Sequence, residues 1–135
     1  GSGDVYKRQD YAPTFLELAG APIPADIQGE SLLPLLKGER PENWRNSLYY
    51  HYYEYPAEHS VKRHYGVRDD RYKLIHFYND IDVWELYDLQ EDPHEMNNLY
   101  GKPSYEAVMK RMRDELYKLQ KQYDDPVGIR FNVSD

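Results

Sequence analysis

HYGVRDDRYKLIHFY, residues 64–78, is the stretch that decides the fold. Its aromatic and β-branched residues favour extended structure and predict two strands, over residues 64–68 and 71–78. Only Asp69 and Asp70 separate them, and two residues are enough for a hairpin turn. The stretch therefore predicts an antiparallel strand pair.

Two further predicted strands flank this hairpin. Residues 47–55 carry Leu48 and a run of tyrosines, which favours a strand over an exposed helix. Residues 83–89 form the fourth predicted strand. Asp92 and Pro93 end it, because a residue before proline favours extended geometry and aspartate favours turns. The four segments predict one antiparallel sheet.

Residues 103–123 carry the clearest helical pattern in the chain. Apolar side chains recur there at spacings of three and four, which marks one face of a long helix. These positions are Tyr105, Val108, Met112, Leu116, Leu119 and Tyr123. Packing this stripe on the sheet predicts an α+β fold, a four-stranded antiparallel sheet packed against one long C-terminal helix, preceded by short helices.

The remaining segments are shorter. Residues 1–9 look like a tag remnant without fixed structure. Residues 10–20 predict a short helix capped by Asp10 and ended by Gly20, and residues 28–38 predict a capped apolar turn too short to fold alone. Residues 125–135 predict a tail, or an added edge strand in which Ile129, Phe131 and Val133 alternate.

Composition narrows the possible partners. The 135 residues carry 17 basic and 24 acidic side chains, a formal charge of −7, which repels a phosphate backbone. No apolar run approaches the roughly 20 residues of a membrane span. We therefore expect neither nucleic acid nor a membrane as a partner. The chain has no cysteine, which excludes disulfides and thiolate metal sites.

Four motifs, in a fixed order, resemble the C-terminal end of the type I, formylglycine-dependent sulfatases of the alkaline-phosphatase-like superfamily. DYAPTFLELAG, residues 10–20, and QGESLLPLLKG, residues 28–38, look like the D-x-x-P-T and Q-G-x-S-L-L-P-L-L segments of that family. YGVR and YKLI, within residues 65–75, are similar to its strand pair, and ELYDLQEDPHEMNNL, residues 85–99, to its E-L-Y-D-L-x-x-D-P motif. Together they cover about residues 10–123.

The resemblance implies a division of the chain and of the chemistry. Residues 10–46 would end the catalytic domain, and residues 47–124 would form a C-terminal subdomain that docks on it. In the family, the catalytic domain holds a divalent metal, usually calcium, and a formylglycine made from Cys or Ser in a C/S-x-P-S/A-R motif. This chain has no cysteine and no serine with proline two residues on. We expect the chain alone to hold neither cofactor and to be inactive.

Polar residues gather on the first two predicted strands and the loop between them. The resemblance implies that this region reaches the substrate, with His64, His59 and Arg63 as candidate substrate-binding residues. His64 alternates with Gly66 and Arg68 on one sheet face, and the glycine leaves room for close approach. A solvated charged loop is the plainer alternative. The gathered residues are His51, Glu54, Glu58, His59, Lys62, Arg63 and His64.

Other polar residues favour structural roles. No tight histidine spacing such as H-E-x-x-H occurs, so we expect no metal site. Arg68 and Arg71 flank the two-aspartate turn and predict ion pairs within the hairpin. Asp88 and Asp92 predict hydrogen bonds from backbone amides in the turn that follows the fourth strand.

These observations lead to one leading function and two alternatives. The leading one is the C-terminal piece of a periplasmic or secreted sulfatase acting on sulfated glycans such as those with N-acetylglucosamine 6-sulfate. Its partners would be the catalytic domain of the parent enzyme and the sulfated carbohydrate, with self-association through an exposed docking face. The alternatives are a stand-alone carbohydrate- or protein-binding module that uses the tyrosine-rich sheet, and a fragment of a related phosphoesterase.

Overall fold

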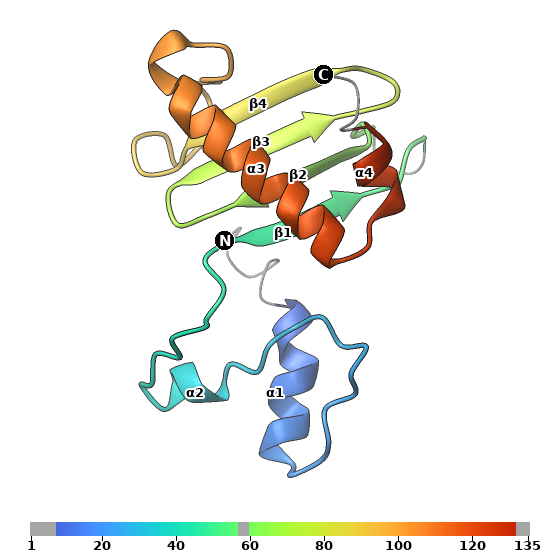
Figure 1. The fold of residues 1–135 in the computed structure, drawn as a ribbon, viewed down its shortest axis with the longest axis vertical. Coiled ribbons are helices and arrows are strands. Elements are labelled where there is room, and N and C mark those ends of the chain that lie inside the picture. The colour runs from blue at the N-terminus through green and yellow to red at the C-terminus, as the bar shows by residue number, and fades with distance from the viewer. Residues whose placement is uncertain (1–7, 57–59, 132–135) are drawn as a thin grey trace. The chain divides into compact units, whose positions relative to one another are not determined.

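The computed structural model describes residues 8–56 and 60–131, which fall into two compact units divided between Arg45 and Asn46. The first unit holds two short helices, α1 (Tyr11–Leu18) and α2 (Leu33–Leu36). The second holds a sheet and its covering helices (Figure 1). Among the described helices, none has the length and apolar composition that a membrane crossing requires.

The sheet has four strands in sequence order, and every neighbouring pair is antiparallel. The strands are β1 (Leu48–Tyr52), β2 (His64–Arg68), β3 (Tyr72–Phe77) and β4 (Val83–Asp88). All four predicted strands are confirmed. β1 ends at Tyr52, before the expected residue 55, because the carbonyls of Tyr53 and Tyr55 accept hydrogen bonds from the Arg63 side chain instead of a strand.

The register assigns every strand residue to one of two faces, since successive side chains alternate and directly paired residues share a face. Tyr65 and Val67 of β2 lie in the core beneath the covering helix, on what we call the helix face. His64, Gly66 and Arg68 lie on the opposite, open face, as the alternation predicts. Their partners on the open face include Tyr50, Tyr52, Lys73, Ile75 and Phe77.

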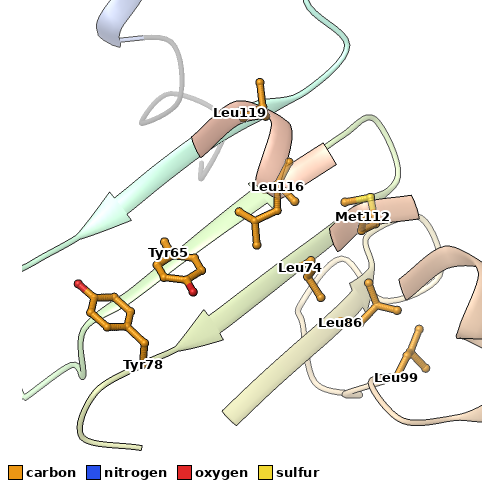
Figure 2. Close-up of a cluster of buried hydrophobic side chains, with 9 residues drawn as sticks. Tyr65, Leu74, Tyr78, Leu86, Leu99, Met112, Leu116 and Leu119 are labelled. Atoms are coloured by element: carbon orange, nitrogen blue, oxygen red, sulfur yellow. The ribbon is translucent and has the colours of Figure 1, made fainter. Parts of the chain in front are cut away.

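A long helix covers the helix face (Figure 1). It begins with a short 3₁₀ turn, η2 (Pro103–Tyr105), and continues as α3 (Glu106–Gln122). Met112, Leu116 and Leu119 are buried on its sheet side, which confirms the predicted helix and its apolar stripe. Figure 2 shows these side chains against the apolar residues of the sheet and the following turn. The core cluster is Tyr65, Val67, Leu74, Tyr78, Leu86, Leu99, Met112, Leu116 and Leu119.

The C-terminal segment differs from the expectation of a tail or an edge strand. Residues Pro126–Phe131 form a helix, α4. Asp125 caps it, because its Oδ1 accepts hydrogen bonds from the amides of Val127 (3.1 Å) and Gly128 (3.0 Å). Pro126 occupies the first helical position, where its missing amide costs nothing. Gly128 lets α4 approach α3, since a Cβ there would lie 2.4 Å from the Gln120 side chain.

The charged residues at the turn of the β2–β3 hairpin form ion pairs with residues outside the hairpin. Arg71 donates three hydrogen bonds to Asp88 of β4, at 3.0, 3.1 and 2.7 Å, and Arg111 of α3 donates one to Asp69 at 2.7 Å. The prediction that Arg71 pairs within the turn was therefore wrong, because the β3–β4 register places Asp88 beside it. Asp69 instead accepts the amides of Arg71 and Tyr72.

The predicted roles of Asp88, the last residue of β4, and of Asp92 in the turn after it are confirmed. The amide of Gln90 donates to Asp88 at 3.2 Å, and the amide of Asn97 donates to Asp92 at 2.7 Å. Asp88 also forms an ion pair with Arg71. Both side chains thus fix the turn that connects the sheet to the long helix.

In the first unit, Asp10 has a different role from the predicted cap. Its side chain makes no capping bond to α1. The buried carboxylate instead accepts hydrogen bonds from the amide of Glu30, at 2.9 Å, and from the guanidinium of Arg45. Thr14 continues this network, because its hydroxyl donates to the Asp10 carbonyl and accepts from the amide of Leu32. The unit is thus held by polar contacts.

Replacing the central methionine of α3 tests the packing of the helix on the sheet. Met112 is fully buried, so we expect Met112→Ala to lower the free energy of unfolding by about 2–5 kcal/mol through lost contacts and a residual cavity. Met96→Ala is the matched control, because Met96 is 83% exposed and its loss should change stability by at most about 0.5 kcal/mol. Urea unfolding of the full chain measures both, and equal effects would contradict this core.

The Arg71–Asp88 pair predicts an acid-dependent loss of stability. Hydrogen bonds from Arg71 hold the pKa of Asp88 below its usual 3.8. A lowered pKa in the folded state stabilises the fold above pH 3.8, and this stabilisation disappears as the pH falls through the folded pKa. The difference in unfolding free energy between the wild type and Asp88→Asn should therefore shrink as urea unfolding is repeated at lower pH.

Asp114→Asn is the control for this experiment, because Asp114 and its partner Lys110 are both exposed. An exposed pair contributes little to stability. If the difference in unfolding free energy between the wild type and Asp88→Asn stayed constant with pH, the charge of the Asp88 carboxylate would not be what stabilises the fold.

Candidate functional site

His64 opens β2 on the open face of the sheet, with its ring held in one orientation. Its Nδ1 lies 2.8 Å from the carbonyl oxygen of Lys62. Because a carbonyl only accepts, Nδ1 is assigned the proton and Nε2 is left as an acceptor when the ring is neutral. Among the described residues, none forms a hydrogen bond with Nε2.

Aromatic rings surround the His64 imidazole and fix its plane. Tyr52 stacks on it with ring centroids 5.2 Å apart, and Phe77 lies tilted against it at 5.0 Å. Tyr50 meets it edge-on at 5.7 Å and crosses Gly66, where an added Cβ would lie 2.7 Å from the Tyr50 hydroxyl. The space that Gly66 was predicted to leave is therefore filled by Tyr50. The result is a half-buried imidazole that offers one nitrogen to a ligand.

Arg63 and Lys62, just before β2, hold the segment that follows β1. The Arg63 guanidinium donates to the carbonyl of Tyr53 at 3.1 Å and to the carbonyl of Tyr55. The Lys62 ammonium donates to the Tyr55 hydroxyl at 2.7 Å and lies 4.1 Å from the centre of that ring. Two of the donors of Arg63 are thus committed to backbone. His59, the third predicted contact residue, lies outside the described residues.

A second polar cluster joins α4 to the sheet, and the sequence analysis did not identify it. We call it the Asp125 cluster, and it contains Asp125, His51, Tyr49 and Tyr78. His51 Nδ1 donates to Asp125 at 2.5 Å, and the Tyr49 hydroxyl donates to the same carboxylate oxygen. The Tyr78 hydroxyl lies 2.5 Å from His51 Nε2. The His51 and Asp125 side chains are only 4% and 6% exposed.

The pKa directions in the Asp125 cluster agree with one protonation state. Burial lowers the pKa of His51 and outweighs the opposing pull of Asp125. Burial acts to raise the pKa of Asp125, but hydrogen bonds from the Gly128 amide, Tyr49 and His51 leave it lowered. Burial also raises the pKa of Tyr78 to about 12. The carboxylate is therefore charged at neutral pH, the imidazole is neutral, and Tyr78 donates to it.

One exposed ring rests on this cluster. The Tyr53 ring stacks on the His51 imidazole with centroids 3.7 Å apart and planes 19° from parallel. Tyr53 is 56% exposed, whereas the imidazole beneath it is buried. The His51, Asp125 and Tyr78 side chains are therefore largely closed to a substrate, but they support a residue that is open to one.

A groove of about 960 Å³ lies between the hairpin and α3. Its lining carries four acidic and four basic side chains, and most of them form ion pairs with one another or with Asp88. This balance gives the groove no preference for an anion such as a sulfate group. The charged residues are Asp69, Asp70, Arg71, Lys110, Arg111, Asp114, Glu115 and Lys118.

The described residues offer no ligand set for the metal ion that the resemblance implies. Within the described residues, no group of three His, Asp or Glu side chains is placed to hold a metal ion. The sequence has no cysteine, and none of its serines has proline two residues on, so it lacks the C/S-x-P-S/A-R motif that a formylglycine requires.

Comparison with known proteins places these observations in a family. The family described as "N-sulphoglucosamine sulphohydrolase, C-terminal" matches residues 2–122. The chain is 59% identical to N-acetylglucosamine-6-O-sulfatase of Bacteroides thetaiotaomicron over 86% of its length and 21% of that protein. It is 34% identical to the multifunctional alkaline phosphatase superfamily protein PehA of Trinickia caryophylli, over 75% of this chain and 21% of that one.

A solved structure shows the same fold. It is a complex of a protein with its substrate D-glucosamine-2-N,6-O-disulfate, and it superposes with a TM-score of 0.84 and 54% sequence identity. The match covers 93% of this chain and 25% of that one, so the chain spans about a fifth to a quarter of these relatives. The predicted resemblance and α+β fold are thereby confirmed. The chain belongs to the family of C-terminal sulfatase domains described as N-sulphoglucosamine sulphohydrolase, C-terminal.

Proposed function

We propose that this chain is the C-terminal part of an enzyme that removes the 6-O-sulfate of N-acetylglucosamine in sulfated glycans. The observation that carries the proposal is its 59% identity to an N-acetylglucosamine-6-O-sulfatase. In this proposal the chain supplies packing and part of the substrate rim. The catalytic centre, with its formylglycine and calcium, lies in the rest of the protein.

Chemical requirements support this division. Hydrolysis of a sulfate ester needs an activated oxygen nucleophile, a cation near the sulfate oxygens and an acid for the leaving alcohol, all within hydrogen-bond reach. The cation–carboxylate pairs Arg45–Asp10 and Arg71–Asp88 join their partners directly, and in each pair the carboxylate is buried. Among the described residues, neither pair leaves a nucleophile and an acid facing one another.

His64 is the residue that we assign to substrate contact. Its ring is fixed by Tyr52 and Phe77, its Nδ1 is bound to the Lys62 carbonyl, and its Nε2 has no partner among the described residues. Such a nitrogen accepts a hydrogen bond from a sugar hydroxyl without any rearrangement. His59 and Arg63 complete the proposed rim. Arg63 contributes positive charge and holds the neighbouring segment in place.

The proposed protein partner is the catalytic domain of the same enzyme. In the first unit, Phe15, Leu18 and Leu36 are 66%, 59% and 71% exposed, although they are the large apolar residues of two short helices. Surface of this kind is normally covered by another part of the protein. The isolated chain should therefore self-associate, and sedimentation can compare its oligomeric state with that of the full-length protein.

We further propose that the full-length enzyme is periplasmic or secreted, which cell fractionation tests.

A related phosphoesterase is the second candidate. The 34% identity to a multifunctional member of the alkaline phosphatase superfamily favours it, because that relative matches the same part of the chain. The much higher identity to the sulfatase makes it the weaker of the two.

The division of labour predicts where activity resides. The full-length protein should release sulfate from N-acetylglucosamine 6-sulfate, whereas the purified 135-residue chain should release none. Ion chromatography of free sulfate measures both. Turnover by the chain alone would place a catalytic centre within it and would contradict the proposal that the catalytic centre lies in the rest of the protein. Faster cleavage of a phosphate or phosphonate ester than of the sulfate ester by the full-length protein would favour the second candidate.

If His64 contacts the substrate, removing its side chain should lower kcat/KM of the full-length enzyme. A sugar hydroxyl that loses its partner costs about 1–3 kcal/mol, so His64→Ala should lower kcat/KM by about tenfold or more. His94→Ala is the matched control, since His94 is an exposed histidine in the turn after β4 and should change kcat/KM little. Equal effects of the two substitutions would remove His64 from the rim.

A further inference from the structure

The Tyr53 ring has one face covered and one face open. The covered face lies on the His51 imidazole at 3.7 Å, and the side chain as a whole is 56% exposed. Within the described part of the chain, His51 is the one ring that stacks on it. A flat apolar face with a hydroxyl at its edge is suited to bind a ligand that has both apolar and polar edges. A sugar ring, with its C–H face and its hydroxyls, is a ligand of that kind.

The support beneath Tyr53 is rigid. Both ring nitrogens of His51 are engaged, Nδ1 by Asp125 and Nε2 by Tyr78, each at 2.5 Å. Asp125 is in turn fixed by the amides of Val127 and Gly128 at the start of α4. The imidazole therefore cannot turn without breaking its bonds to Asp125, the residue that caps α4, and to Tyr78, the residue that follows β3.

Two cationic side chains hold the same segment in place. Arg63 binds the carbonyls of Tyr53 and Tyr55, and Lys62 binds the Tyr55 hydroxyl. The Arg63 cation is thus held at the backbone of the platform segment, where its positive charge favours an anionic substituent on a bound sugar. A ring that is held before the ligand arrives loses little entropy on binding.

We propose that Tyr53 is a further substrate-contact residue, a platform on which a sugar ring of the sulfated glycan stacks, and that Asp125 is a positioning residue that holds the platform through His51. The proposal rests on the proposed function. Tyr53 directly follows Tyr52, whose register partner is His64, so the platform and the assigned imidazole lie at the same end of the sheet. His51, which carries the platform, pairs with Tyr65 on the helix face, whereas His64 lies on the open face, so the platform extends the proposed contact region to the other face of the sheet at this end.

Binding and kinetics of the full-length enzyme test the platform. Tyr53→Ala should raise KM, and the Kd for N-acetylglucosamine 6-sulfate measured by calorimetry, by about tenfold with kcat unchanged, because stacking is lost and the chemistry is not. Tyr53→Phe keeps the ring and should stay within about twofold of the wild type. Tyr100→Ala is the matched control, since Tyr100 also stacks on a ring, that of Trp84 at 5.7 Å, and should leave KM unchanged.

A double-mutant cycle tests the positioning role. Asp125→Asn should raise KM in the wild-type background and have no further effect on KM in the Tyr53→Ala background, because both changes remove the same platform. A merely destabilising substitution would add its effect in either background. Additive effects would therefore overturn the positioning role of Asp125.

The outcomes separate this proposal from the proposed function. Wild-type turnover with an unchanged KM and Kd in Tyr53→Ala would overturn the platform and leave the function standing. Binding of the sulfated sugar that is weakened by Tyr53→Ala, without turnover by the wild type, would support the platform and overturn the function. Failure of the wild-type protein to bind the sugar at all would overturn both.

Discussion

The alternation of side chains along the central strands is the constraint on which the second unit depends. Tyr65 and Val67 point to the helix face, and Leu74 and Leu86 lie beside them in the neighbouring strands. Met112 and Leu116 of α3 complete that layer, because burial of apolar area drives the helix onto it. A shift of register by one residue would exchange the two faces and expose the core. The position of His64 on the open face follows from the same register.

The spacing of apolar residues and the residues at the turns were sufficient to predict the sheet and the long helix from the sequence. The hairpin around Asp69 and the stripe through Met112 are local signals, readable over a few neighbouring residues. The last helix was missed, although Asp125 followed by Pro126 is a local signal for a helix start. The segment was predicted to be a tail, with an edge strand as the alternative that its alternating apolar residues suggested. It forms a helix because it packs on α3, and Gly128 permits the close approach.

The candidate site was only partly predictable, because its supports are distant in sequence. Register alone placed His64 on the open face of the sheet, but it could not show that Arg63 is bound to backbone carbonyls. The contact between His51 and Asp125 joins residues 74 positions apart, and no sequence spacing announces it. Asp10 failed as a predicted cap for the same reason, since its partner Arg45 lies 35 residues away.

The position of Asp125, after the end of α3, also limits where this domain can be truncated or fused to another protein. A chain cut after residue 124 would keep every strand and the whole of α3, and would look complete by its secondary structure. It would nevertheless lose the only carboxylate that His51 Nδ1 contacts in the described part of the chain. Any truncation or fusion of the domain that is meant to preserve the His51–Asp125 contact must therefore extend beyond α3 and include α4.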